Sequence, residues 1–345
     1  VIRRNMSYCV SIMKPGSPSV LKILEMDMPI PKEGEVCIEV HYAGINFADT
    51  LMRLGLYQPR PPFPFTPGYE LSGTIHSLGN GVTEFEVGQR VVAAMPTGGQ
   101  SSHVAVKVSR VIPVPDDMGL DEAAAMPVTY LTAHHMLHYL GHLKKGETVL
   151  IHGGAGGVGT AALQICQWAG IDKVWATASG SKSGVIEKFG GIAIDRHNED
   201  FVKIIKEATD GRGVDHILDP IGGDNLTRSL SVLAEGGRLY TYGMSAAAPN
   251  SKRSLIRAFL AWRKTPKFDA LKLMTRNRGV FGVHMGTWKD EDAMSKQLHK
   301  IMDGIKQGYL NPVIDSIFDA ENVADAHQYI HDAKNIGKVL LRFKK

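Results

Sequence analysis

The stretch His152-Gly153-Gly154-Ala155-Gly156-Gly157-Val158-Gly159 follows an apolar run, Thr148-Val149-Leu150-Ile151. Glycines 154, 156 and 159 have GxGxxG spacing, and a helix is predicted over residues 159–169, which open with Thr160-Ala161-Ala162-Leu163-Gln164 after the last glycine. A glycine turn between a strand and a helix lets a pyrophosphate approach backbone N–H groups at the positive end of the helix dipole. The stretch therefore predicts a dinucleotide site built from Gly154, Ala155, Gly156, Gly157, Val158 and Gly159.

Strand-like and helix-like segments alternate after this turn. The segments typical of strands are 173–177, 192–194, 215–218 and 238–242. Those typical of helices are 182–189, 200–209 and 225–233. Helices between strands at this spacing predict an α/β fold with a doubly wound parallel sheet of the Rossmann type.

The end of the second strand indicates which nucleotide binds. A site for NAD carries Asp or Glu about 20 residues after the glycines, where it binds the ribose 2′-hydroxyl. Residues 176–182 read Ala-Thr-Ala-Ser-Gly-Ser-Lys and contain no acid. Ser179 and Lys182 suit a 2′-phosphate, and Arg196 could add charge or stack on adenine. The sequence predicts NADP(H), with the alternative that Lys182 is only the first charge of a surface helix.

Composition places the chain among globular proteins of about two domains. Its 345 residues are 43% hydrophobic and 21% charged, which excludes a disordered or fibrous protein. A net charge of +4 without an aromatic-basic motif gives no reason to expect nucleic acid. Three isolated cysteines exclude a four-thiolate zinc site. We also expect no membrane span and no secretory signal, and Met6 is a candidate natural start that would leave residues 1–5 as an addition.

The first 125 residues have the pattern of a β-rich domain. Short runs such as 36–40 and 90–94 are bounded by turn residues. Five prolines between positions 59 and 67 predict one stiff, non-helical loop.

Several stretches resemble the zinc-independent quinone oxidoreductases, a group of the medium-chain dehydrogenase/reductase superfamily. They are residues 146–164 across the glycine turn, 43–57, Pro67-Gly68-Tyr69-Glu70 and Gly337-Lys338-Val339. Within that group the chain is most similar to the vesicle amine transport protein homologues, on residues 177–182, 276–286 and 335–341. The resemblance covers nearly the whole chain.

The resemblance implies two domains. A GroES-like catalytic domain would comprise residues 1–125 completed by 288–345, and a Rossmann NADP-binding domain would comprise 126–287. Asn46 and Tyr57 are implied to line the pocket beside the nicotinamide as hydrogen-bond donors. The alternatives are a loop-capping role for Asn46 and simple packing for Tyr57.

Further residues follow from the same resemblance. Cofactor contacts are implied at Thr132, Gly243, Phe281 and Val283, although the segment around 281 could instead be the edge strand of a dimer. Asp49 is expected to orient its loop rather than transfer protons.

We expect no metal. The zinc ligands of related alcohol dehydrogenases correspond here to Asn46, Tyr69 and Val128, which are no zinc set. Tyr69 is instead expected to line the pocket beside the nicotinamide. Three histidines, His134, His135 and His138, share one helix but lack nearby carboxylates or thiolates, so we expect them on a polar helix surface.

The expected activity is NADPH-dependent reduction of a quinone or an α,β-unsaturated carbonyl, by a homodimer. The alternative is an NADPH-binding adaptor at vesicle or mitochondrial membranes with little or no turnover. The basic, helical residues 249–277 are either a solvated surface or a docking face for a membrane or partner. We expect a cytoplasmic location, with peripheral membrane association as an open alternative.

Overall fold

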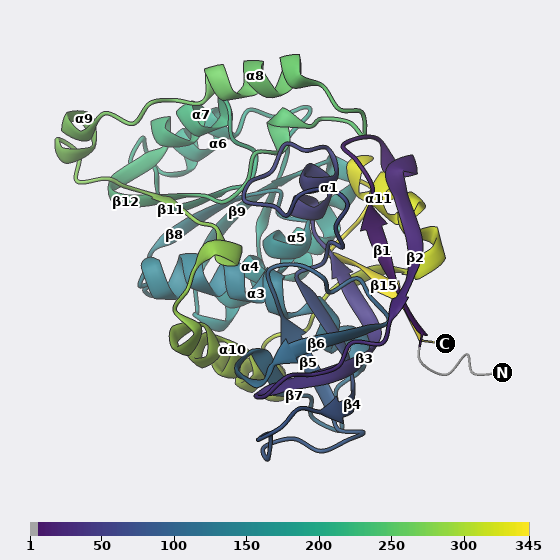
Figure 1. Ribbon diagram of the computed structural model, residues 1–345. Coiled ribbons are helices and arrows are strands. Elements are labelled where there is room, and N and C mark those ends of the chain that lie inside the picture. Colours follow the sequence, from purple (N-terminus) through teal and green to yellow (C-terminus); the bar gives the residue numbers. More distant parts are fainter. Residues whose placement is uncertain (1–5, 345) are drawn as a thin grey trace.

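The computed structural model describes residues 6–344, and residues 1–5, whose origin the sequence left open, lie outside that range. The chain forms one parallel sheet and one mainly antiparallel sheet, plus a hairpin of β1 (Met6–Ile12) and β2 (Leu21–Asp27) (Figure 1). This mixed architecture confirms the expected fold class.

The parallel sheet has six strands in the order β10-β9-β8-β11-β12-β13. The strands are β8 (Thr148–His152), β9 (Lys173–Ala178), β10 (Ile192–Asp195), β11 (Val214–Asp219), β12 (Leu233–Thr241) and β13 (Gly279–Gly282). This is the strand order 3-2-1-4-5-6 of a dinucleotide-binding fold, in which ligands bind beyond the carboxyl ends of the strands at the switch between β8 and β11. The strands expected from sequence are all present.

Helices alternate with these strands. They are α4 (Gly157–Trp168), α5 (Ser183–Lys188), α6 (Phe201–Ala208) and α7 (Asn225–Ser231), followed by α8 (Leu255–Lys264) and α9 (Ala270–Met274) between β12 and β13. The helix α4 begins two residues earlier than expected. Figure 1 shows α8 and α9 at the outer rim of this half of the molecule.

The second sheet is built from both ends of the chain. Its strands run β14-β15-β3-β4-β5-β7, with β6 also paired to β3. They are β3 (Glu35–Ile45), β4 (Glu70–Leu78), β5 (Arg90–Ala94), β6 (His103–Lys107), β7 (Val111–Pro113), β14 (Ile314–Asp319) and β15 (Lys338–Arg342). The strand β15, near the end of the chain, pairs with β3, so both ends of the chain contribute to this sheet. The proposed boundaries, 1–125 with 288–345 and 126–287, stay predictions.

The remaining helices surround the two sheets. They are α1 (Phe47–Arg53), α2 (Leu120–Ala125), α3 (Pro127–His134), a π-helical turn (His135–Leu140), α10 (Glu291–Lys306) and α11 (Val323–His331). A large buried cluster joins α3 and α4 to the parallel sheet, and a second one fills the antiparallel half. The loop of residues 54–69, with its five prolines, contains no helix.

One expectation about this layer is wrong. His134 and His135 are only 4% and 6% exposed, and they do not form a polar surface. Helix α10 covers them, and the side chain of Gln297 lies 3.0 Å from Nδ1 of His134 and 3.4 Å from Nδ1 of His135. Polar partners on a distant helix therefore make burial of these imidazoles tolerable. His138 is partly buried beside them.

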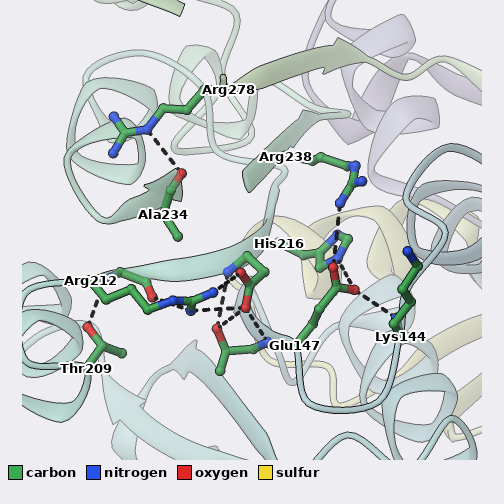
Figure 2. A network of polar contacts seen from close by, with 11 residues as sticks. Lys144, Glu147, Thr209, Arg212, His216, Ala234, Arg238 and Arg278 are labelled. Atoms are coloured by element: carbon green, nitrogen blue, oxygen red, sulfur yellow. Dashed lines mark hydrogen bonds and ion pairs between the residues drawn. The ribbon is translucent and has the colours of Figure 1, made fainter. Parts of the chain in front are cut away.

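A polar network joins the amino-terminal ends of β8 and β11, at the edge of the sheet away from the glycine turn (Figure 2). The Nε2 atom of His216 lies 3.0 Å from Glu147, and Arg238 approaches the same carboxylate at 3.8 Å. Arg212 pairs with Asp215 at 2.5 Å. Burial lowers the pKa of His216, so its neutral ring donates to Glu147. This network ties the strands together at the edge opposite the candidate site.

Candidate functional site

The glycine turn between β8 and α4 is shaped so that only glycine fits. Gly153 has a φ of 69°, a region that L side chains rarely adopt. A Cβ atom on Gly154 would lie 2.5 Å from the Cβ of Ala176, and one on Gly159 would lie 2.3 Å from the oxygen of Gly153. No side chain among residues 6–344 caps the start of α4 at Gly156. These features fit a helix terminus that receives a pyrophosphate.

Buried polar groups support the turn from below. The ring of His152 lies 3.1 Å from Oγ1 of Thr177 and 3.0 Å from Oγ of Ser229. Ser229 in turn donates to Asp219 at 3.1 Å, and Asp219 also accepts the N–H groups of Ile221 and Gly222. Burial lowers the pKa of His152, which favours its neutral form. This series of hydrogen bonds links the carboxyl ends of three neighbouring strands, β9, β8 and β11. No pattern in the sequence indicates it.

Lys182 and Arg196 lie together near the ends of β9 and β10. The N–H of Arg196 donates to the oxygen of Ala178 at 2.8 Å, and the N–H of Lys182 donates to the oxygen of Ser179 at 2.8 Å, so both cations leave the same strand end. Burial lowers the pKa of Lys182, and the charge of Arg196 lowers it further. Ser179 immediately precedes the short turn that carries Lys182. Asp195 is also near, but it accepts hydrogen bonds from His197 and Asn198 of its own loop. The three residues predicted to read a 2′-phosphate are thus brought together.

The C-terminal segment lies against this nucleotide edge. The ammonium of Lys182 donates to the backbone oxygens of Ala333 at 2.7 Å and Asn335 at 2.6 Å. The N–H of Gly337 donates to the oxygen of Ala155 in the glycine turn at 2.8 Å. Residues 333–337 therefore contact both the predicted 2′-phosphate residues and the predicted pyrophosphate turn. In the sequence, part of this segment is marked only by its resemblance to the vesicle amine transport protein homologues.

Asn46 belongs to a buried charged cluster beside the carboxyl edge. Its Nδ2 donates to Glu70 at 3.0 Å, and Lys338 donates to its Oδ1 at 2.6 Å. Lys338 also pairs directly with Glu70, and the other Glu70 oxygen accepts the N–H of Val128 at 2.6 Å. The exposed fractions of Glu70 and Lys338 are 0% and 3%. The carboxamide is held at both ends, with one amide hydrogen left for a further acceptor.

Asp49 orients the loop around Asn46, as expected from sequence. Its carboxylate accepts the N–H of Asn46 at 2.8 Å and the N–H of Gly68 at 3.2 Å. Asp49 is completely buried, and this burial raises its pKa to about 7, against the lowering effect of those N–H groups and of Lys338. The alternative reading of Asn46 also has support, because the residue caps helix α1.

Tyr57 lies in an aromatic cluster with Tyr69 and His284. The Tyr57 ring is 5.2 Å from that of His284, measured between centroids. Burial raises the pKa of Tyr57, and a hydrogen bond with Tyr69 opposes the rise. Burial likewise raises the pKa of Tyr69 well above its usual value, with the charge of Asp49 adding to it. Both phenols are therefore protonated donors at neutral pH. The sequence analysis did not single out His284.

The other predicted cofactor residues lie in and around the parallel sheet. Thr132 is buried in α3, and Val283 is buried just after β13. Phe281 stacks on Tyr240 with 5.6 Å between ring centroids. A Cβ atom on Gly243 would lie 2.5 Å from the oxygen of Pro220, so the chain passes closely there. Their roles toward a nucleotide stay predictions.

The residues at the positions of a catalytic zinc do not fit that ion. Asn46 and Tyr69 are engaged with Glu70 and Tyr57, and Val128 offers only its backbone. Between residues 6 and 344, no group of three or more His, Cys, Asp or Glu side chains is arranged to hold a metal. The absence of a metal stays a prediction.

Two family descriptions match the chain. "Alcohol dehydrogenase GroES-like domain" matches residues 32–116, and "Zinc-binding dehydrogenase" matches residues 191–341. The synaptic vesicle membrane protein VAT-1 homolog of Rattus norvegicus is 38% identical over 315 residues, which are 91% of this chain and 78% of the relative. The quinone oxidoreductase of Pongo abelii is 30% identical and covers 96% of both chains. The chain belongs to the zinc-independent quinone oxidoreductase group of medium-chain dehydrogenases/reductases, near VAT-1.

Solved structures of this superfamily have the same architecture. The Escherichia coli quinone oxidoreductase, solved in complex with NADPH, superposes with a TM-score of 0.85 at 26% identity, over 97% of this chain and 99% of that one. The CurK enoyl reductase superposes with a TM-score of 0.84 at 28% identity, over the same shares.

Proposed function

We propose that this quinone oxidoreductase-group protein is an NADPH-dependent reductase that transfers hydride to a quinone or an α,β-unsaturated carbonyl without a metal. The observation that carries the proposal is the glycine turn beside the cations Lys182 and Arg196. This arrangement suits a dinucleotide with a 2′-phosphate. Relatives solved with NADPH or named as quinone and enoyl reductases support both the cofactor and the reaction class.

The chain's own residues would bind and orient both molecules. The turn from Gly154 to Gly159 would hold the pyrophosphate, with Ser179 and Lys182 at the 2′-phosphate. NADPH supplies the hydride when bound. Tyr57 and the free amide hydrogen of Asn46 would donate hydrogen bonds to the substrate oxygen, where negative charge develops. Conjugation spreads that charge, so a quinone or enone needs less help than an alcohol, whose oxidation calls for a Lewis acid or a strong base.

The direct test is NADPH oxidation against 1,4-quinones and enones of graded size. We expect turnover with at least one class, a clear preference for NADPH over NADH, and no stoichiometric zinc by metal analysis. Tight NADPH binding without oxidation by any acceptor would leave the adaptor as the function. A preference for NADH would contradict the proposal that Ser179, Lys182 and Arg196 bind a 2′-phosphate.

A second candidate function, peripheral binding to anionic membranes, rests on α8 and α9. Large apolar side chains on these helices are exposed: Leu255, Ile256, Phe259, Leu260, Trp262, Leu271 and Met274. Basic residues surround them: Lys252, Arg253, Arg257, Arg263, Lys264, Lys267, Lys272 and Arg276. An apolar face flanked by cations has the composition of a helix that lies in an anionic lipid interface. No helix in residues 6–344 is long and apolar enough to cross a bilayer.

A hollow of about 430 Å³ next to α9 fits the same proposal. Its lining includes Lys267, Lys272 and Arg276, with the apolar side chains of Phe268 and Leu273. The lining also includes Arg278 and one acidic residue, Asp269, so four cations against one carboxylate would attract a phosphate headgroup. The vesicle or mitochondrial location of the adaptor hypothesis would follow from this surface, with the cytoplasm as the general location.

Vesicle flotation tests this surface. We expect the protein to bind phosphatidylserine vesicles more strongly than phosphatidylcholine vesicles, and the double variant I256D/W262S to lose that binding. The variant I30D is the matched control, because Ile30 is 85% exposed and lies far from α8 in the sequence. Equal binding of I256D/W262S and the unaltered protein would contradict the assignment.

We also propose a homodimer formed through β13, the last strand on one side of the parallel sheet. Pairing of Gly279–Gly282 with its copy would satisfy backbone groups that an edge strand leaves unpaired. Light scattering should give twice the 37.6 kDa mass of one chain. A monomer at micromolar concentration would exclude this interface.

A further inference from the structure

We infer that His284 supplies the proton that completes hydride transfer, with Tyr57 and Tyr69 positioning its ring. The inference rests on the proposed reductase function and adds a named proton donor to it. It explains why an imidazole that hydrogen-bonds nothing else in residues 6–344 is held among two phenols.

The backbone brings His284 to the carboxyl edge of the parallel sheet. The preceding residue, Val283, donates its N–H to the oxygen of Thr241 at 2.9 Å, at the carboxyl end of β12. His284 follows directly, on the edge where an open α/β sheet binds its ligands. The residue is thus placed on the same side of the sheet as the glycine turn.

Side-chain contacts then fix the ring. It lies against Tyr57 at 5.2 Å between centroids, with 31° between the ring planes. A Cβ atom on Gly286 would come within 3.2 Å of both His284 and Tyr69, so this glycine lets the two rings approach each other. The imidazole therefore contacts the residue that sequence analysis assigned to the nicotinamide pocket.

Both ring nitrogens of His284 are shielded from solvent and have no hydrogen-bond partner in the described residues. A buried polar atom without a partner costs about 1–3 kcal/mol, so it calls for a reason. A substrate oxygen held by Tyr57 would provide the missing partner. The titratable groups that face the ring are the phenols of Tyr57 and Tyr69, with Asp49 behind Tyr69.

Among these groups, the imidazole is the one whose polar ring atoms are unengaged and can carry a proton to the substrate. Burial raises the pKa of both phenols, so Tyr57 and Tyr69 are poor acids that orient rather than protonate. Asp49 already accepts two backbone N–H groups and is fully buried.

The proposed step balances. Hydride addition at the β-carbon of an enone brings two electrons, and the C=C pair moves toward the oxygen as an enolate. One N–H bond of the His284 imidazolium breaks, its electron pair stays on nitrogen, and the proton bonds to the enolate. The neutral imidazole regains a proton from solvent. A quinone also needs one proton in addition to the hydride.

The first experiment compares H284Q with the unaltered protein on an enone. General acid catalysis contributes about 10²–10⁴-fold, so we expect kcat to fall by about 100-fold while the Kd for NADPH stays within twofold. The unaltered protein should lose activity as pH rises, and H284Q should lose that pH dependence. H299Q, which changes an exposed histidine of α10, is the matched control.

A second measurement does not depend on turnover. With NADP⁺ present, 4-nitrophenolate mimics the enolate, and calorimetry in buffers of different ionisation enthalpy reports proton uptake on binding. We expect the number of protons exchanged on binding to be the same in the unaltered protein and in Y57F, and to differ in H284Q. H284N serves in place of H284Q should the latter not fold.

The outcomes distinguish a failure of the role of His284 from a failure of the proposed reductase function. Unchanged kcat, pH profile and proton uptake in H284Q would overturn the role of His284. Loss of the pH dependence in Y57F instead would make Tyr57 the donor. Absence of NADPH oxidation in the unaltered protein with every acceptor would count against the proposed function, and the proton-uptake measurement would still decide whether His284 holds the proton.

Discussion

The ammonium nitrogen of Lys338 lies 2.6 Å from Oδ1 of Asn46, which joins β15, near the end of the chain, to the residue that begins α1. Lys338 is also the only cation paired with Glu70 in residues 6–344. The carboxamide predicted to face the nicotinamide is therefore oriented by a residue 292 positions away. Several consequences of this arrangement can be measured.

Replacing Lys338 by Met should destabilise the protein by about 3–5 kcal/mol, because Glu70 would remain as an unpaired buried charge. Denaturant unfolding measures this loss. The matched control is K344A, which breaks the exposed pair with Glu39 and should cost at most about 1 kcal/mol. The double variant K338M/E70Q should recover part of the stability, and no recovery would contradict the pairing argument.

Replacing Lys182 by Ala should weaken NADPH binding by about 10- to 100-fold, because a charge-assisted contact to phosphate is lost. NADH, which lacks the 2′-phosphate, should bind almost as before. Fluorescence titration of both nucleotides measures the difference, with K188A as the control from the end of α5. Equal losses for NADPH and NADH would refute the phosphate-binding role.

Replacing Tyr57 by Phe should lower kcat by about 10- to 100-fold, because one donor to the developing negative charge is removed. NADPH binding should stay nearly intact, since the ring and its packing remain. Steady-state kinetics and nucleotide titration separate the two quantities. Y139F, which alters an exposed tyrosine, should change neither, and an unchanged rate in Y57F would remove Tyr57 from the catalytic residues.

Stability should fall on mild acidification. Burial lowers the pKa of His135, His138 and His331 to about 4, and Arg53, 2.7 Å from His331, contributes to the last of these shifts. Unfolded histidines titrate near 6.5, so below that pH the unfolded chain binds more protons and the folded state loses stability. Asp49 acts in the opposite direction, because its raised pKa makes the folded state the better proton acceptor below about pH 7.

Burial also lowers the pKa of His134, His152, His216 and His327, so the histidines together outweigh the one carboxylate and stability should fall between pH 7 and pH 5. Chemical denaturation across this range measures it. The variant H331Q should flatten the dependence, whereas H299Q, at an exposed site, should leave it unchanged. A stability that rises from pH 7 to pH 5 would show that these rings are not held neutral.

The parallel sheet could be predicted because its signals are local. A glycine turn between an apolar strand and a helix is contained in a dozen residues around Gly156, and the strand periodicity repeats after it. The start of α4 was placed two residues late because Gly157 and Val158 were read as turn, although their backbone is already helical.

The candidate site could be predicted only where its parts are close in sequence. Ser179, Lys182 and Arg196 lie near one another on adjacent strand ends. Lys338 and Glu70 meet across 268 positions, so no spacing rule connects them, although both belong to stretches quoted for the family resemblance. His284 lies in a stretch quoted for the family resemblance, but no motif or spacing marks it as functional, since its significance lies in contacts with Tyr57.

The histidines of α3 show where local reasoning fails. Polar residues at neighbouring helical positions usually face water. Here α10, more than 150 positions later, supplies Gln297 as a partner for His134 and His135, and burial follows. Only the tertiary arrangement of α10 over α3 reveals this.

In the proposed NADPH site, the backbone oxygens of Ala333 and Asn335 would compete with the nucleotide for Lys182, because both already accept hydrogen bonds from its ammonium. A 2′-phosphate would bind the Lys182 ammonium only by replacing one or both of the hydrogen bonds that the ammonium donates to these backbone oxygens. Those carbonyls lie more than 150 positions along the sequence from Lys182 and from the strand end proposed to bind the ribose. Cofactor preference could therefore be retuned by shortening or stiffening that distant loop, with every nucleotide-facing side chain left as it is.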